Sequence, residues 1–105
     1  MTLSMPVFIL ASAGFYTVSM IAMKFWGQGV SPLIVLVTVV ALAAGAGLEI
    51  EALRTERLGL IYVGILGAEC IMIAIASYVL FGESFTAKEV AGAGLIVAGT
   101  ALAWA

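Results

Sequence analysis

One segment of the chain, Leu58–Phe81, runs for 24 residues with a single charged side chain, Glu69. A helix of about 20 apolar residues, rising about 1.5 Å per residue, crosses the roughly 30 Å of hydrocarbon in a bilayer. No water is present there to bond the backbone, so a spanning segment must satisfy its own N–H and C=O groups, as an α-helix does. The segment therefore predicts a membrane-spanning helix.

The composition of the 105 residues supports a membrane protein. Hydrophobic residues make up 65% and charged residues 10%, against about 25% charged in soluble domains, and the mean hydropathy is +1.29. We expect an integral membrane protein with the lipid bilayer as a partner and no nucleic-acid binding, which would need a basic surface. With no histidine and one cysteine, Cys70, we expect no disulfide framework, no metal site and no cofactor such as haem.

The other apolar segments predict three more helices. The chain is expected to form one all-α domain, an integral membrane four-helix bundle with spans at residues 6–25, 32–53, 58–81 and 90–104. Because the connections are short, helices that follow each other in sequence should lie antiparallel as neighbours. Four crossings place both termini on the same side of the membrane.

The basic residues do not select one orientation in the membrane. Lys24 and Lys88 fall on one expected side, and Arg54 and Arg57 fall on the other. Because cytoplasmic connections normally carry the excess of lysine and arginine, this balance leaves two interpretations open. In the first, four basic residues are too few to set an orientation, or a partner protein fixes the topology. In the second, the chain inserts in both directions and forms an inverted dimer.

Glu69 is the costliest residue of the predicted bundle. A carboxyl at the centre of a spanning helix costs about 2.5–3.5 kcal/mol on insertion scales, and such groups usually face away from lipid and often carry function. Tyr62 precedes it by seven residues on the same helix face. A carboxyl placed there is expected to exchange a proton for a cation. The alternative is a protonated glutamate that hydrogen-bonds a neighbouring helix, for instance at Tyr16, and serves packing alone.

Two other spans carry patterned faces. In the first span, Ser12, Tyr16 and Ser19 follow helical spacing, and they either line a cavity that faces Glu69 or let helices pack closely. In the fourth span, small and apolar residues share one face and predict a helix-packing interface whose partner is left open. The residues of that face are Gly92, Leu95, Ile96 and Gly99.

The charged residues outside the spans predict no chemistry. Glu49 and Glu51, at the end of the second span, are interpreted as a solvated helix end in which Glu51 can pair with Arg54. The sequence shows no nucleophile with a base, no phosphate-binding loop and no carboxylate cage for a metal. We therefore expect a protein that is not an enzyme.

Three motifs give the chain a resemblance to the small multidrug resistance proteins and the wider drug/metabolite transporter superfamily. Met23-Lys24-Phe25 is similar to the end of that family's first helix. Ala52-Leu53, followed by Leu58-Gly-Leu-Ile-Tyr62, is similar to its passage from helix two into helix three. Phe81-Gly82-Glu83, with the face of Gly92, Leu95, Ile96 and Gly99, is similar to the start and the dimer contact of its fourth helix.

The resemblance implies a small transporter, in the bacterial inner membrane, that works as a homo- or heterodimer with its site between two chains. The family's drug/proton exchangers use a first-helix glutamate, where this chain has Tyr16, and the family's aromatic residue early in helix three falls on Ile65. Tyr62 matches a family tyrosine, and Glu69 replaces a small residue. Relatives without the first-helix glutamate include paired subunits that resemble lipid-linked sugar flippases.

Two functions follow from these observations. In the first, the chain is a transporter or flippase subunit, Glu69 binds a proton or cation, and Tyr16 and Tyr62 shape the cavity. In the second, it is a non-transporting accessory subunit of a larger membrane protein complex. The missing first-helix glutamate and the glycine-bearing face of the fourth span fit this alternative.

Overall fold

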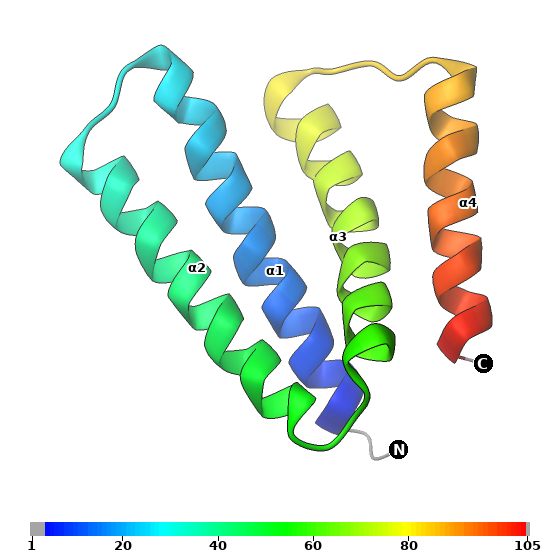
Figure 1. Cartoon of the computed structure of the whole chain (residues 1–105). Coiled ribbons are helices and arrows are strands. Elements are labelled where there is room, and N and C mark those ends of the chain that lie inside the picture. The colour runs from blue at the N-terminus through cyan, green and yellow to red at the C-terminus, as the bar shows by residue number, and fades with distance from the viewer. Residues whose placement is uncertain (1–3, 105) are drawn as a thin grey trace.

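The computed structural model describes residues 4–104, and most of them are helical (Figure 1). The helices are α1 (Ser4–Phe25), α2 (Pro32–Leu53), α3 (Leu58–Phe81) and α4 (Ala87–Trp104), and one 3₁₀ turn, η1 (Trp26–Gln28), follows α1. The described residues include no strand. The predicted all-α class is confirmed, and α2 and α3 begin and end at the limits of the second and third apolar segments.

Local signals in the sequence set the helix ends. The Ser31 hydroxyl accepts a hydrogen bond (3.2 Å) from a backbone N–H in the first turn of α2, and Pro32 takes the first position, where its missing N–H costs nothing. α3 stops at Gly82, whose φ of 63° is left-handed and favours glycine. Before α4, the side chains of Thr86 and Glu89 each accept a hydrogen bond from the other's backbone N–H, at 3.2 and 2.8 Å, which is a capping box.

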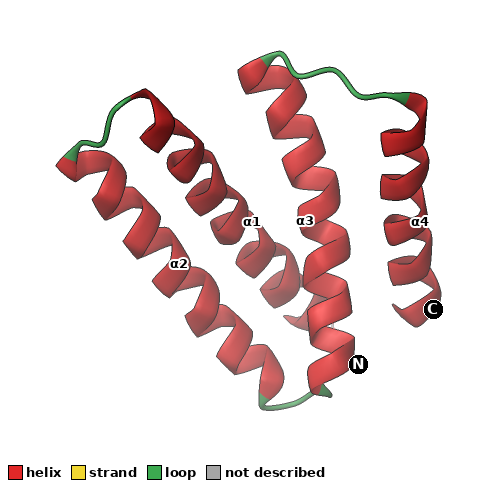
Figure 2. Cartoon of the chain, turned by 45° about the horizontal axis from the view of Figure 1, so that its top comes forward, coloured by secondary structure: helices red, strands yellow, loops and turns green. Residues whose placement is uncertain are grey.

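The four helices lie side by side in one layer (Figures 1 and 2). The order across the layer is α2, α1, α3, α4, and the molecule measures 42 × 35 × 18 Å. α1 packs against both α2 and α3, α4 packs against α3, and α2 touches α3 little although only residues 54–57 separate them in sequence. The predicted bundle is therefore corrected to an open row, in which α1 separates α2 from α3.

A close contact between α1 and α2 explains why α1 takes the central place. Gly45 of α2 is buried, and a Cβ at this position would lie 3.0 Å from Cε1 of Tyr16. One turn earlier on α1, the Ser12 hydroxyl donates a hydrogen bond to the Gly45 carbonyl oxygen (2.8 Å). Small residues and hydroxyls thus bring these two helices together along the length of α1, as is common between helices in membranes.

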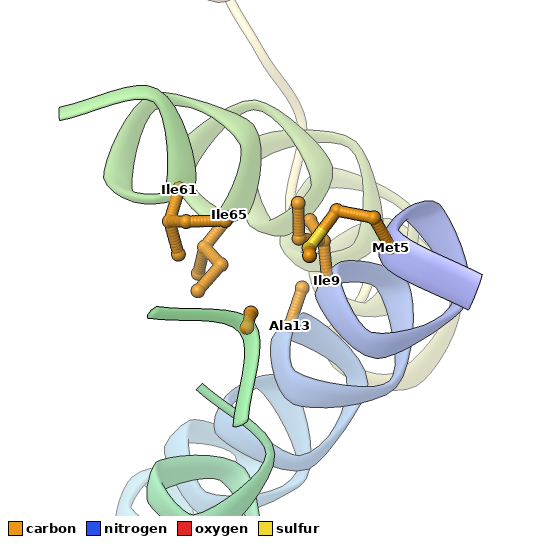
Figure 3. Packing of buried hydrophobic residues seen from close by; sticks show 6 residues of the cluster. Met5, Ile9, Ala13, Ile61 and Ile65 are labelled. Atoms are coloured by element: carbon orange, nitrogen blue, oxygen red, sulfur yellow. The ribbon is translucent and has the colours of Figure 1, made fainter. Parts of the chain in front are cut away.

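The apolar core lies between α1 and α3, near the lower end of Figure 1. Its buried residues, shown in Figure 3, are Met5, Ile9, Ala13, Ala52, Ile61 and Ile65. From this core α1 and α3 diverge toward the upper end, where the connections after α1 and α3 lie (Figures 1 and 2). Both described ends of the chain lie at the lower end, as the antiparallel order of four helices requires.

Within residues 4–104, three helices are long and apolar enough to cross a membrane, and they make this a helical membrane protein. The segments are Met5–Gln28, Pro32–Leu53 and Leu58–Phe81. α4 has 18 residues and carries Lys88 and Glu89 in its first turn. The remaining residues 90–104 span only about 22 Å at about 1.5 Å per residue, so the fourth crossing stays a prediction.

Candidate functional site

A groove of about 350 Å³ lies between α1, α2 and α3, and two glutamates, Glu49 of α2 and Glu69 of α3, line it. Its lining is Tyr16, Ser19, Met20, Met23, Leu42, Glu49, Tyr62, Ile65, Leu66 and Glu69. Glu49 and Glu69 are both half-buried, whereas Tyr62 is 57% exposed. Two carboxyls and two phenols therefore share one space among helices that are otherwise strongly apolar.

Tyr16 ties Glu49 to α1. Its hydroxyl donates a short hydrogen bond, 2.6 Å, to Glu49 Oε1. Glu49 follows Gly45 by one helical turn, so the tyrosine ring lies over the glycine while the hydroxyl reaches the carboxyl. A Cβ at position 45 would require the ring to shift by a few tenths of an ångström, so the Tyr16–Glu49 bond is made beside a close contact.

Glu69 has a different setting from Glu49. Within residues 4–104, Glu69 makes no hydrogen bond and no ion pair with protein groups. Its side chain is half-buried and lines the groove. The sequence analysis gave Tyr16 as a candidate hydrogen-bond partner of Glu69. In the structure, the Tyr16 hydroxyl donates its hydrogen bond to Glu49 instead. Glu69 is thus the carboxyl of this groove that is available to a ligand.

The two carboxyls lie at different depths in the layer. Glu69 is 11 residues from Leu58, the start of α3, which places it about 16 Å from the lower helix end and near the middle of the span. Glu49 is four residues from Leu53, the end of α2, which is about 6 Å from the same side. Glu49 therefore lies near the lower end of the groove, and Glu69 lies deeper, toward the centre of the membrane.

The structure brings Tyr16, Tyr62 and Glu69 together, as the sequence analysis expected of one cavity. The sequence analysis left open whether the serines of α1 line a cavity or let helices pack closely, and the two serines differ in this. Ser19 lines the groove, and its hydroxyl donates to the Tyr16 carbonyl oxygen (2.6 Å). Ser12 is fully buried against α2 and serves packing.

Sequence reasoning missed Glu49, which it placed at a solvated helix end. Glu51 does behave that way, since it is exposed and lies 3.6 Å from Arg54. Glu49 points from the same helix into the groove. The signal that could have found it is the predicted span itself, because a segment that ends at residue 53 places Glu49 a full turn inside it.

The predicted interface on α4 faces away from the rest of the chain. α4 packs on α3 through Ala93, Val97, Thr100 and Trp104, which are partly buried. The four predicted interface residues, Gly92, Leu95, Ile96 and Gly99, are all exposed, with Leu95 at 75%. This face is free within the described chain, and a partner for it stays a prediction.

Comparisons with known proteins do not assign this site. No protein-family model, no curated protein and no solved structure matches the chain. Within residues 4–104, no three histidine, cysteine, aspartate or glutamate side chains gather as metal ligands would. The chemistry of the groove therefore has to be inferred from its own two carboxyls and two phenols. Carboxylates and tyrosine faces bind positive charge, and carboxyls also carry protons.

Proposed function

We propose that this chain is a subunit of a small membrane transporter or flippase of the drug/metabolite transporter type. Glu69 binds a proton or a positively charged group of the cargo, and Glu49 with Tyr16 and Tyr62 forms the rest of the site. One observation carries the proposal: two glutamates and two tyrosines from three apolar helices line the same groove. A carboxyl without a protein partner is costly in a span, and such groups are functional more often than structural.

The layered shape supports a dimer as the working form. The groove lies between α1, α2 and α3, and the layer that these helices help to form is only 18 Å thick. Carboxyls near the middle of a membrane must be shielded from acyl chains, so a second chain laid over the groove would complete the site. Transporters commonly place the site near the midplane between repeated or inverted halves. The even split of basic residues between the two ends allows such an inverted pair.

A proton-exchange assay tests the proposal. Purified protein is reconstituted in liposomes that contain a pH-sensitive dye, and simple organic cations are added outside as probe cargo. Cation entry in exchange for protons should raise the internal pH. Glu69→Gln and Glu49→Gln should both return the signal to that of protein-free liposomes, because a neutral amide can neither release a proton nor pair with a cation.

Glu51→Gln is the matched control for this assay. It lies two residues from Glu49 on the same helix but is exposed and outside the groove, so it should exchange as the wild type does. Full exchange by Glu69→Gln would remove this carboxyl from the mechanism. If no cation is exchanged by the wild type, a flipping assay with fluorescent phospholipids tests the flippase form with the same variants.

An accessory subunit is the second candidate, and the exposed outer face of α4 is the observation that favours it. Purification in a mild detergent separates the two proposals. Co-migration with a larger complex at fixed stoichiometry supports the accessory role, whereas a self-contained dimer supports the transporter.

A further inference from the structure

A second cavity lies between the upper halves of α1 and α3, next to the acidic groove. It has a volume of about 130 Å³. Met20 lines both this upper cavity and the groove that contains Glu69. A methionine is unbranched and has three rotatable bonds, so one adaptable side chain borders both spaces.

The lining of the upper cavity is mainly apolar, but four polar residues contribute to it. They are Thr17, Lys24, Ser77 and Glu83. The hydroxyls of Thr17 and Ser77 donate to carbonyl oxygens of their own helices, at 2.8 and 3.0 Å, and their oxygens can still accept hydrogen bonds. These oxygens and the two charged side chains give a mainly apolar cavity a few polar contacts for a cargo.

At the far end of the upper cavity, the ends of α1 and α3 are in contact. Lys24 Nζ lies 3.3 Å from Glu83 Oε2 and 5.7 Å from the centre of the Phe81 ring. The Phe25 and Phe81 rings are 5.4 Å apart. Beyond the core at the lower end, these contacts bridge the ends of two helices that otherwise diverge (Figures 1 and 2).

The acidic partner of this contact is held in place by the end of α3. Gly82 takes a left-handed backbone conformation, and the Glu83 N–H donates to the Ser77 carbonyl oxygen (3.2 Å). The Lys24 and Glu83 side chains remain 57% and 41% exposed. An exposed ion pair of this kind is weak, so it can open without a large penalty.

We propose that the upper cavity is the second half of the cargo path and that the Lys24–Glu83 contact is its gate. This inference rests on the proposed transport function. When the contact breaks, the upper ends of α1 and α3 move apart about the core at their lower ends, and the upper cavity opens. Rotation of Met20 then joins the cavity to the groove at Glu69.

Cysteine labelling tests the gate without any cargo. Thr17 is only 6% exposed and lines the upper cavity but not the groove. In a Cys70→Ala background, which removes the single native cysteine, Thr17→Cys reports opening through its reaction with a membrane-impermeant maleimide. The protein is placed in nanodiscs, where both membrane sides are accessible and insertion direction does not matter.

Breaking the ion pair should speed this labelling several-fold. Lys24→Gln and Glu83→Gln should each raise the rate, and the exchanged pair Lys24→Glu with Glu83→Lys should return it to that of the parent. Lys88→Gln is the control, because Lys88 is an exposed lysine at the same end and has no ion pair within residues 4–104. Ala76→Cys, on the opposite wall of the cavity, replaces Thr17→Cys if that variant does not fold.

Equal labelling rates with and without the ion pair would contradict the proposed gate. A labelling rate that stays high in the variant with the exchanged pair would contradict it too. Neither result depends on transport. If the labelling rate does not depend on the Lys24–Glu83 pair while proton exchange still requires Glu69, the gate is wrong and the proposed function stands. If labelling follows the pair but no probe is transported, the gate motion stands and the transport function fails.

Discussion

Thr100 of α4 rests directly on Gly67 of α3, so closely that a Cβ on the glycine would overlap the threonine side chain. The Thr100 hydroxyl also lies 3.3 Å from the Val63 carbonyl oxygen, one turn earlier on α3. Trp104 repeats the arrangement one turn on, over Gly64, and its indole N–H donates to the Leu60 carbonyl oxygen (3.1 Å). α4 is thus held by α3 through two glycine contacts.

Gly67→Ala should loosen α4. Overpacking of a close contact costs about 1–3 kcal/mol, because either Thr100 or the whole helix must move. Trp104 fluorescence in a Trp26→Phe background, followed during unfolding with SDS, should show an earlier transition. Gly94→Ala is the control, since nothing lies within 4 Å of a Cβ there, and it should gain about 0.5–1 kcal/mol from the better helix former. Equal behaviour of the two variants would contradict the packing described for α4.

Tyr16 and Glu49 should show energetic coupling. Tyr16→Phe removes the donor of the 2.6 Å hydrogen bond, and hydrogen bonds between membrane helices contribute about 0.6 kcal/mol on average and up to about 1.7. A double-mutant cycle with Glu49→Leu, which removes the acceptor oxygens, should give a coupling energy in that range when it is measured by unfolding in SDS. Tyr78→Phe is the control, because Tyr78 is 67% exposed and donates no hydrogen bond within residues 4–104. A coupling energy near zero would mean that the two side chains act independently.

Gly45→Ala should weaken the same hydrogen bond from the other side. A Cβ at position 45 meets the Tyr16 ring at 3.0–3.1 Å and the Ser12 carbonyl oxygen at 3.3 Å. The ring must shift by a few tenths of an ångström, which changes the position of its hydroxyl relative to Glu49. We expect Gly45→Ala to weaken the Tyr16–Glu49 coupling, whereas Gly47→Ala, which meets nothing within 4 Å, should preserve it. Undiminished coupling in Gly45→Ala would show that the ring can be accommodated elsewhere.

The sequence was sufficient for the helices and for part of the site. Apolar length defined α2 and α3, and Pro32, Gly82 and Thr86 mark helix ends by local rules that need no tertiary contact. Tyr62 and Glu69 could be placed on one face because helical spacing decides it. These features depend on neighbours in sequence, so they can be read from it.

The order of the helices and the role of Glu49 could not be derived in the same way. Short connections favour sequential neighbours, but the fit of Tyr16 over Gly45 holds α1 against α2, and the core around Ile61 holds α1 against α3. α1 therefore separates two helices that are adjacent in sequence. The span that ends at residue 53 places Glu49 within the membrane, but its partner Tyr16 lies 33 residues away in sequence, and such a contact leaves no local pattern.

Reporter tags at the two chain ends test the fourth crossing and the balance of charges together. If α4 crosses the membrane, tags at the N- and C-termini should report the same side, because both described ends lie at one end of the layer (Figure 1). With Lys24 and Lys88 at one end and Arg54 and Arg57 at the other, each tag should be found on both sides of the membrane. In a variant that inserts in a single orientation, tags on opposite sides would show an odd number of crossings and exclude α4 as a span.

One added charge should then select a single orientation. Gln28→Arg adds a cation at the upper end and Thr55→Arg adds one at the lower end, and both positions are exposed. Because the side richer in lysine and arginine stays cytoplasmic, the first variant should place the termini outside and the second should place them inside. Unchanged exposure in both variants would mean that a partner, and not the charge balance, sets the topology. An inverted homodimer also requires both orientations in one membrane, so neither variant alone should retain proton exchange, while their co-expression should restore it.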